Sequence, residues 1–120
     1  MTGDRNKSLG AYGERVAAQR LTDAGMTVLD RNWRCDAGEV DLVLRDGEVV
    51  VICEVKTRSS AAYGHPLEAV GAVKAARLRR LAALWLQAHD VHAPGVRIDV
   101  VGVLLAARGA AEVEHVRGVG

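Results

Sequence analysis

Two acidic side chains and a lysine lie in two consecutive Val- and Leu-rich segments of the chain. Asp41 lies in the segment Glu39–Arg45, whereas Glu54 and Lys56 lie in the segment Glu48–Thr57. Carboxylates are oxygen ligands of the kind that Mg²⁺ prefers, and an ammonium group beside them can orient a water molecule or stabilise charge on a phosphate. These residue types therefore predict metal-dependent hydrolysis of a phosphodiester bond, provided that the fold brings them together.

The dipeptide Asp46–Gly47 separates the two segments. An Asp-Gly pair between two apolar runs is a strong hairpin signal, because both turn positions tolerate positive φ. A two-residue turn at this dipeptide places Asp41 opposite Ile52. Because alternate side chains of a strand share a face, Asp41, Glu54 and Lys56 are predicted on one face of the sheet. Asp41 and Glu54 are then diagonal neighbours, with Cβ atoms roughly 7 Å apart.

A plainer interpretation is a strand edge that carries solvated charges, which is common in antiparallel pairs. The apolar pattern argues against it. Val49, Val51 and Cys53 occupy one face of the second segment, and the apolar Val50 and Ile52 share the face of the charged residues. A strand that is apolar on both faces is normally covered on both, so we expect the charged residues at the mouth of a partly buried cleft.

Helical periodicity and turn residues predict the elements that position these side chains. The first helix is expected over Lys7–Ala24, and the second runs from Pro66 to about His89. The predicted strands are Met26–Arg34, Glu39–Arg45, Glu48–Thr57, Val96–Leu105 and Glu112–Val116. This order predicts an α/β sandwich with one mixed five-stranded sheet flanked by helices. The 120 residues suit a single domain spanning 1–120, with residues 1–7 as a flexible tail.

Composition narrows the class of protein further. The net charge is only +1, but the segment between Val55 and His89 holds six basic residues and one acidic residue, so it carries +5 and the remainder −4. This asymmetry favours a local phosphate-binding surface, although a solvated helix face has the same composition. The polar N-terminus lacks the apolar stretch of a signal peptide, and the longest apolar run is too short to span a bilayer. A cytoplasmic protein that does not enter membranes is expected.

Five runs of the sequence resemble the YraN-like family of predicted endonucleases. They are Gly13–Glu14, Arg31–Arg34, Gly38–Val43, Glu54–Arg58 and Arg97–Val101, and the likeness extends from about Leu9 to Val116. That family resembles the PD-(D/E)XK nuclease superfamily, in particular archaeal Holliday-junction resolvases. The resemblance implies a restriction endonuclease-like fold, a site that uses Mg²⁺ or Mn²⁺, and a nucleic-acid substrate, with DNA favoured over RNA.

The resemblance also implies roles for individual residues. Asp41, Glu54 and Lys56 match the D…E-x-K positions of the superfamily, and Glu14 matches an acidic residue on the first helix of resolvase-like members. By this likeness Asp41, Glu54, the Val55 carbonyl and Glu14 are the predicted metal ligands, and Lys56 positions or activates the attacking water. No Pro precedes Asp41, which departs from the superfamily pattern.

Three further residues are candidates for substrate binding. Arg58 and Tyr63 follow the strand that carries Glu54, where they are well placed to contact substrate or serve as a plain connection. Lys74 falls on the apolar stripe of the second helix. Its stem packs there with the ammonium reaching solvent, or the start of the helix faces the cleft and Lys74 contacts phosphate.

Three functions remain open from the sequence. The first is an endonuclease that cuts branched, nicked or single-stranded DNA in repair or recombination. The second is a nucleic-acid-binding module of the same fold with weak or no catalysis, and the near-neutral charge supports it. The third is an interaction protein that acts as a homodimer. Asp99, which lies within an apolar strand, is expected to have a buried hydrogen-bonding role rather than a catalytic one.

Overall fold

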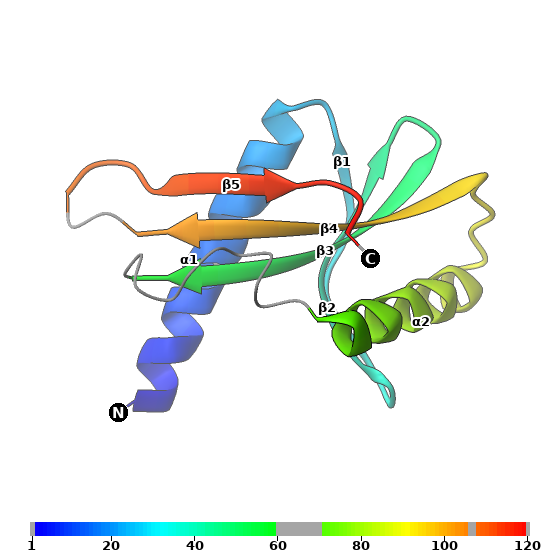
Figure 1. The fold of residues 1–120 in the computed structure, drawn as a ribbon, viewed down its shortest axis with the longest axis horizontal. Coiled ribbons are helices and arrows are strands. Elements are labelled where there is room, and N and C mark those ends of the chain that lie inside the picture. Colours follow the sequence, from blue (N-terminus) through cyan, green and yellow to red (C-terminus); the bar gives the residue numbers. More distant parts are fainter. Residues whose placement is uncertain (1, 60–70, 106–107, 120) are drawn as a thin grey trace.

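The computed structural model of the chain describes residues 2–59, 71–105 and 108–119. Two helices and five strands lie within them: α1 (Thr2–Asp23), β1 (Thr27–Cys35), β2 (Gly38–Asp46), β3 (Val49–Arg58), α2 (Ala72–His89), β4 (Gly95–Leu104) and β5 (Glu112–Val116). The strands form one sheet in the order β1-β2-β3-β4-β5. The helices α1 and α2 pack on opposite faces of this sheet (Figure 1).

The sheet is mixed, as the sequence predicts. β3 and β4 are parallel, with α2 between them in the chain, and the other three neighbouring pairs are antiparallel. A parallel pair needs a long crossover connection, and here that connection carries a helix. The α/β arrangement expected from the element order is therefore confirmed, and it is consistent with a restriction endonuclease-like sandwich.

The predicted boundaries of both helices need correction. α1 begins at Thr2 rather than Lys7, so residues 2–7, predicted as a tail, are helical. α2 begins at Ala72, and Gly71 before it has extended backbone with φ −86° and ψ 176°. The predicted start at Pro66 lies outside the described residues. Within the described residues, no helix combines the length and the apolar character needed to cross a membrane.

The predicted register of the β2–β3 hairpin is wrong. Ile52 lies opposite Val43 rather than Asp41, because the turn residues are Gly47 and Glu48 and Asp46 remains in the strand. Gly47 has φ +61°, and a glycine with positive φ at the first turn position is what a type II′ turn requires. The shift is two residues, an even number, so it does not by itself turn any side chain to the other face. Val40 and Val43 nevertheless lie in the same core cluster, so strict alternation breaks between them.

The sheet forks beside Asp41 and Glu54. The β2–β3 ladder ends at the pair Leu42 and Cys53, whereas β3 continues beside β4 as far as Arg58. β2 meanwhile continues beside β1 to its first residue. Continuing the β2–β3 register by one position sets Asp41 beside Glu54, so both are the first residues beyond the fork.

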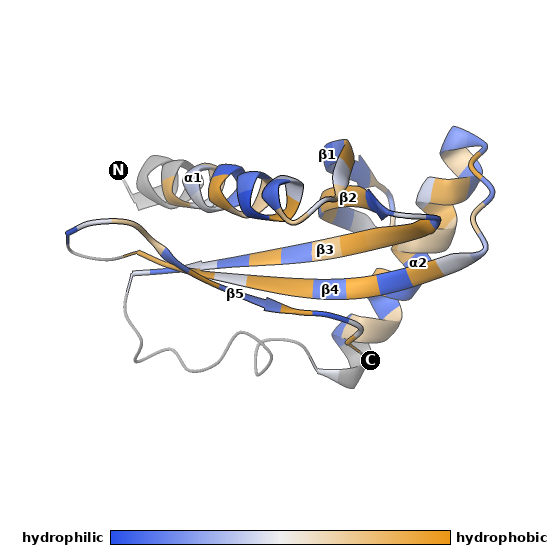
Figure 2. Ribbon diagram, turned by 90° about the horizontal axis from the view of Figure 1, so that it is seen from above, coloured by the Kyte–Doolittle hydropathy of each residue, from blue (hydrophilic) through white to orange (hydrophobic). Residues whose placement is uncertain are grey.

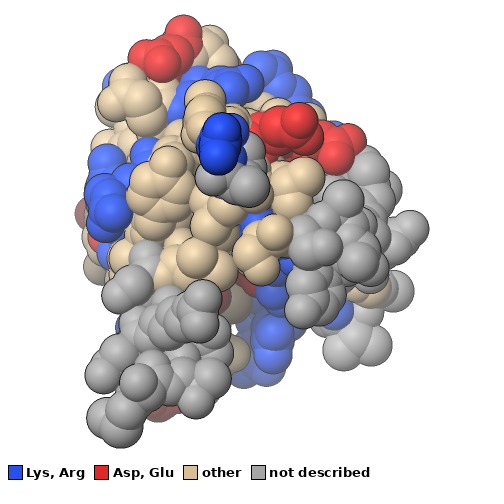
Figure 3. Space-filling model, turned by 90° about the vertical axis from the view of Figure 1, so that its left-hand side faces the viewer, with Lys and Arg blue, Asp and Glu red and all other residues tan. Residues whose placement is uncertain are grey.

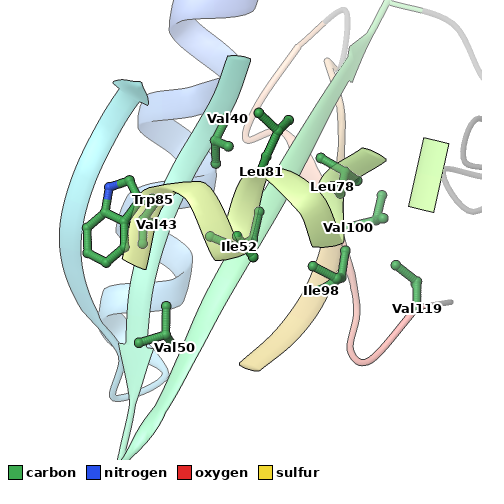
Figure 4. Packing of buried hydrophobic residues seen from close by; sticks show 11 residues of the cluster. Val40, Val43, Val50, Ile52, Leu78, Leu81, Trp85, Ile98, Val100 and Val119 are labelled. Carbon is green, nitrogen blue, oxygen red and sulfur yellow. The ribbon is translucent and has the colours of Figure 1, made fainter. Parts of the chain in front are cut away.

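Two clusters of buried apolar side chains hold the helices on the sheet. On the α2 face, the side chains labelled in Figure 4 include Leu78, Leu81, Trp85, Val43, Ile52 and Val100. On the α1 face, the cluster includes Ala17, Leu21, Leu44, Val51, Cys53 and Val101. Much of β3 is accordingly apolar between the two layers (Figure 2). Each fully buried Leu or Val contributes about 1.5–3 kcal/mol, so both clusters stabilise the packing of the helices on the sheet.

Candidate active site at the fork of the sheet

Asp41 lies at the fork and bridges the two separating strands. Its Oδ2 accepts a hydrogen bond of 2.8 Å from the backbone N–H of Val55, the residue after Glu54. In the ladder between β1 and β2, Arg31 pairs with Leu42 and Trp33 pairs with Val40, so the ladder skips Asn32 and Asp41 between them. Asn32 has φ +51°. Asp41 is therefore left out of the ladders on both sides of β2.

Glu54 is buried and forms ion pairs with two lysines. Its Oε1 lies 2.7 Å from the Nζ of Lys74 on α2 and 3.2 Å from the Nζ of Lys56 on β3. Glu54, at 9% exposure, is one of two buried charged residues in the described part of the chain. Of the two placements open to Lys74 from the sequence, the structure has the one in which the start of α2 faces the site.

Burial and like charge perturb the ionisation of these groups. Burial raises the pKa of Asp41 to about 7, the Val55 N–H opposes the shift, and the neighbouring acids, chiefly Glu54, add to it. The pKa of Lys56 is lowered, first by burial and then by its contact with Lys74. Burial also opposes the charge of Lys74, but its bonds to Glu54 and Lys56 leave its pKa raised. Ionisable groups whose pKa values are shifted by burial and by a charged neighbour are typical of functional sites.

Glu14 approaches the site from α1. Burial raises its pKa, a hydrogen bond from the Asn32 side chain opposes that shift, and the charges of Glu39 and Glu54 add to it. Asn32 was not predicted to take part. Its signal in the sequence is weak, since Asn is merely one of the residue types that tolerate positive φ.

Gly13 explains how α1 comes close enough to bring Glu14 there. A Cβ at Gly13 would overlap the side chain of Thr57 on β3 and lie 2.8 Å from its Cβ. Only a residue without a side chain allows this approach. A glycine inside a helical pattern, next to a glutamate, was the signal that the sequence offered.

The remaining candidates for substrate binding from the sequence are Arg58 and Tyr63. Arg58 is the last residue of β3 and is partly buried. Tyr63 lies outside the described residues. The face at the tips of β3 and β4 shows acidic and basic side chains side by side rather than charge of a single sign (Figure 3).

The donor set fits one hard cation. Asp41 and Glu54 provide carboxylate oxygens at the fork, and a cation bound there would relieve the repulsion between them. Within the described residues, no three His, Cys, Asp or Glu side chains are gathered closely enough to hold a metal together. A site here therefore relies on two carboxylates, backbone oxygen and water, as Mg²⁺ sites commonly do. The ligand roles of Asp41, Glu54, Val55 and Glu14 all stay predictions.

Asp99, the other buried charged residue, has the role that the sequence predicts. Its Oδ1 accepts hydrogen bonds from Arg97 Nε at 2.8 Å and the Gly118 N–H at 3.1 Å. Its Oδ2 lies 3.0 Å from a second Arg97 nitrogen and 2.7 Å from His115 Nε2. Arg97 also contacts Asp46 at 3.0 Å. This network joins β4, β5 and the end of β2.

The fold and the site together define an α/β protein with a charged cluster at the fork of a mixed sheet. Residues 13–103 match the uncharacterised protein family UPF0102. A UPF0102 protein of Beutenbergia cavernae is 65% identical over 113 residues, covering 94% of this chain and 96% of that protein. Another, from Nocardioides sp., is 59% identical over 114 residues, covering 95% and 92%. The chain therefore belongs to UPF0102, which confirms the resemblance to the YraN-like family.

Proposed function

We propose that the chain is a metal-dependent endonuclease of the PD-(D/E)XK type that hydrolyses phosphodiester bonds in DNA. The observation that carries the proposal is Asp41, a half-buried carboxylate beside Glu54 that accepts one hydrogen bond within the described residues. A carboxylate crowded by other acids in this way favours a bound cation. Lys56, on the same strand as Glu54, supplies the positive group that phosphoryl chemistry needs.

Asp41, Glu54 and the Val55 carbonyl would hold Mg²⁺ or Mn²⁺, with Glu14 as a further carboxylate. Such an ion, when bound, lowers the pKa of water and neutralises charge on the phosphate.

The ammonium of Lys56 positions the attacking water, and the proton that this water loses passes to solvent. Lys74 faces the same carboxylate and offers its charge to a phosphate oxygen. Attack at phosphorus breaks the bond to the 3′ oxygen, which takes up a proton from solvent. The products are a 5′-phosphate and a 3′-hydroxyl.

The test is cleavage of labelled linear, flapped and four-way-junction DNA in Mn²⁺. We expect the wild type to cut at least one substrate and Lys56→Ala to lose about 10²–10³-fold in rate while it still binds DNA. Arg20→Ala, which removes an exposed cation from the last turn of α1, is the matched control and should cut normally. Equal cleavage by the wild type and Lys56→Ala would refute the assignment of Lys56.

A second candidate is a nucleic-acid-binding module without efficient catalysis. The pairing of Glu54 with both Lys56 and Lys74 favours it, because the two lysines neutralise this carboxylate without a cation. Salt-dependent DNA binding by the wild type, with no cleavage of any substrate in Mg²⁺ or Mn²⁺, would establish the module in place of the nuclease.

A further inference from the structure

A groove of about 700 Å³ lies on the α2 side of the sheet, next to the β1–β2 turn. Trp33, Cys35 and Ala37 line it from the strands and the turn, and α2 contributes residues from Arg77 to Ala88. At a rise of about 1.5 Å per residue, this stretch of helix is roughly 16 Å long. The groove is therefore long enough for a short stretch of one strand.

The groove begins where the proposed active site ends. Lys74 contacts Glu54, and Arg77 lies one helical turn further along α2. Their like charges interact, since Arg77 disfavours the charged form of Lys74. Arg77 and Arg80 both line the groove, so Lys74, Arg77 and Arg80 form a row of cations that leads from the site.

The two arginines are available to a ligand. Both are exposed, and neither has an ion-pair partner within the described residues. Asp36 is the acidic residue among those that line the groove, so the positive charge is in excess. Arg79 differs from its neighbour Arg80, because it lines a separate hollow beside Val96.

Trp33 gives the groove an aromatic surface on a firm support. It is partly buried against the core cluster of α2, and its ring meets that of His89 edge-on at 6.0 Å between centroids. β1 is also tied to α2 by a hydrogen bond of 2.9 Å from Trp85 Nε1 to Asp30 Oδ2. An aromatic ring held in place beside a row of cations is the combination that binds single strands, where bases stack and phosphates pair with Lys or Arg.

We infer that this groove binds single-stranded nucleic acid adjoining the cleavage site, with one base stacked on Trp33 and phosphates on Arg77 and Arg80. The inference rests on the proposed function and deepens it, because it makes the substrate a flap, gap or other single-stranded region. A duplex cannot stack its paired bases on Trp33, so its binding uses the cations alone.

The experiment measures binding of a labelled dT oligonucleotide of about 15 nucleotides, in EDTA so that no cleavage occurs. The same label on a rU oligonucleotide and on a hairpin duplex separates DNA from RNA and single strand from double strand. We expect dT to bind the wild type more tightly than the duplex. Binding should also quench the emission of Trp33, whereas Trp85, at 2% exposure, is shielded.

Substitutions then identify the contacts. Trp33→Leu should weaken dT binding about tenfold and leave duplex binding nearly unchanged. Arg80→Ala should lower the slope of log K against log salt by about 0.7, the value for one lost single-strand phosphate contact. Arg79→Ala is the matched control from the same helix and should leave that slope unchanged. Arg80 is exposed, so its variant keeps the test valid even if Trp33→Leu fails to fold.

The outcomes separate the two proposals. If the wild type cuts DNA but Trp33→Leu and Arg80→Ala bind dT as the wild type does, the groove assignment is wrong and the endonuclease stands. Equal effects of Arg79→Ala and Arg80→Ala would also refute the groove. If the wild type binds dT through Trp33 and Arg80 but cuts nothing, the groove stands and the nuclease is refuted in favour of the binding module.

Discussion

Two of the buried or partly buried aspartates in the described part of the sheet, Asp41 and Asp99, have opposite environments. Asp99 on β4 accepts four hydrogen bonds, from Arg97, His115 and the Gly118 N–H. Asp41 on β2 accepts one within the described residues, from the Val55 N–H, and has other acids near it. Although burial opposes it, the bonding partners lower the pKa of Asp99, whereas burial raises the pKa of Asp41 to about 7.

This difference separates a structural carboxylate from one available for binding. The charge on Asp99 is compensated within the fold by four hydrogen bonds, and through Arg97 it links β4 and β5 to the end of β2. The charge on Asp41 lacks such compensation. A site that is destabilised until a cation arrives is what the proposed nuclease requires, and the contrast gives predictions of opposite sign for the two residues.

The largest expected effect is on cleavage. Asp41→Asn keeps the shape of the side chain but removes its charge, so we expect the cleavage rate to fall at least about 10³-fold. Because the substitution also removes repulsion among acids, the variant should unfold at the same or a higher temperature than the wild type. Single-turnover cleavage and calorimetry check both. A variant that loses activity by unfolding would contradict the assignment.

Asp99→Asn should show the reverse pattern. It leaves Arg97 and His115 without their charged partner in a buried position, which costs about 3–5 kcal/mol of the free energy of unfolding. Urea denaturation measures that loss. Cleavage by the fraction that remains folded should be unaffected, and a stability within about 0.5 kcal/mol of the wild type would show that the network contributes little.

The two residues should also give stability curves of opposite slope against pH, measured with a chelator present. Asp99 has a lowered pKa, so its contribution to the free energy of unfolding is present above about pH 3.9 and is lost as the pH falls. Asp41 has a raised pKa, so its contribution is present below about pH 3.9 and is lost as the pH rises towards 7. Relative to the wild type, the free energy of unfolding of Asp41→Asn should therefore rise by about 1–3 kcal/mol as the pH increases from about 3.9 to 7. Parallel curves would contradict the contrast.

A smaller effect is expected from the contact that brings α1 to the site. Gly13→Ala introduces a Cβ into the side chain of Thr57, and such overpacking costs about 1–3 kcal/mol of stability. It should also move Glu14 and reduce cleavage. Thr57→Ala, combined with Gly13→Ala, removes Oγ1, the nearest contacting atom, and Cγ2 but leaves Cβ, so it should recover part of both losses. No recovery would show that the contact does not set the position of α1.

Much of the fold and of the candidate site could be predicted, because they depend on local patterns. Alternation of side chains predicted one face for Asp41, Glu54 and Lys56, and the charge of Lys74 on an apolar stripe left the cleft as one of two possible placements. The β2–β3 register could not be predicted, because Asp-Gly fits more than one turn type and Asp46 has a distant partner in Arg97.

The fork in the sheet and the role of Asn32 also escaped prediction. Both depend on where one ladder ends while its neighbours continue, which is a property of the whole sheet rather than of any segment. The groove beside Trp33 has the same origin, since it joins β1 to α2 across a long stretch of sequence.

The most direct test of the account is calorimetric titration of the chain with Mn²⁺ at about pH 7.5. The account predicts that the wild type binds the ion, that Asp41→Asn loses at least about tenfold in affinity, and that folded Asp99→Asn binds as the wild type does. Binding of Mn²⁺ by Asp41→Asn with wild-type affinity would contradict the claim that this carboxylate at the fork is the centre of the site.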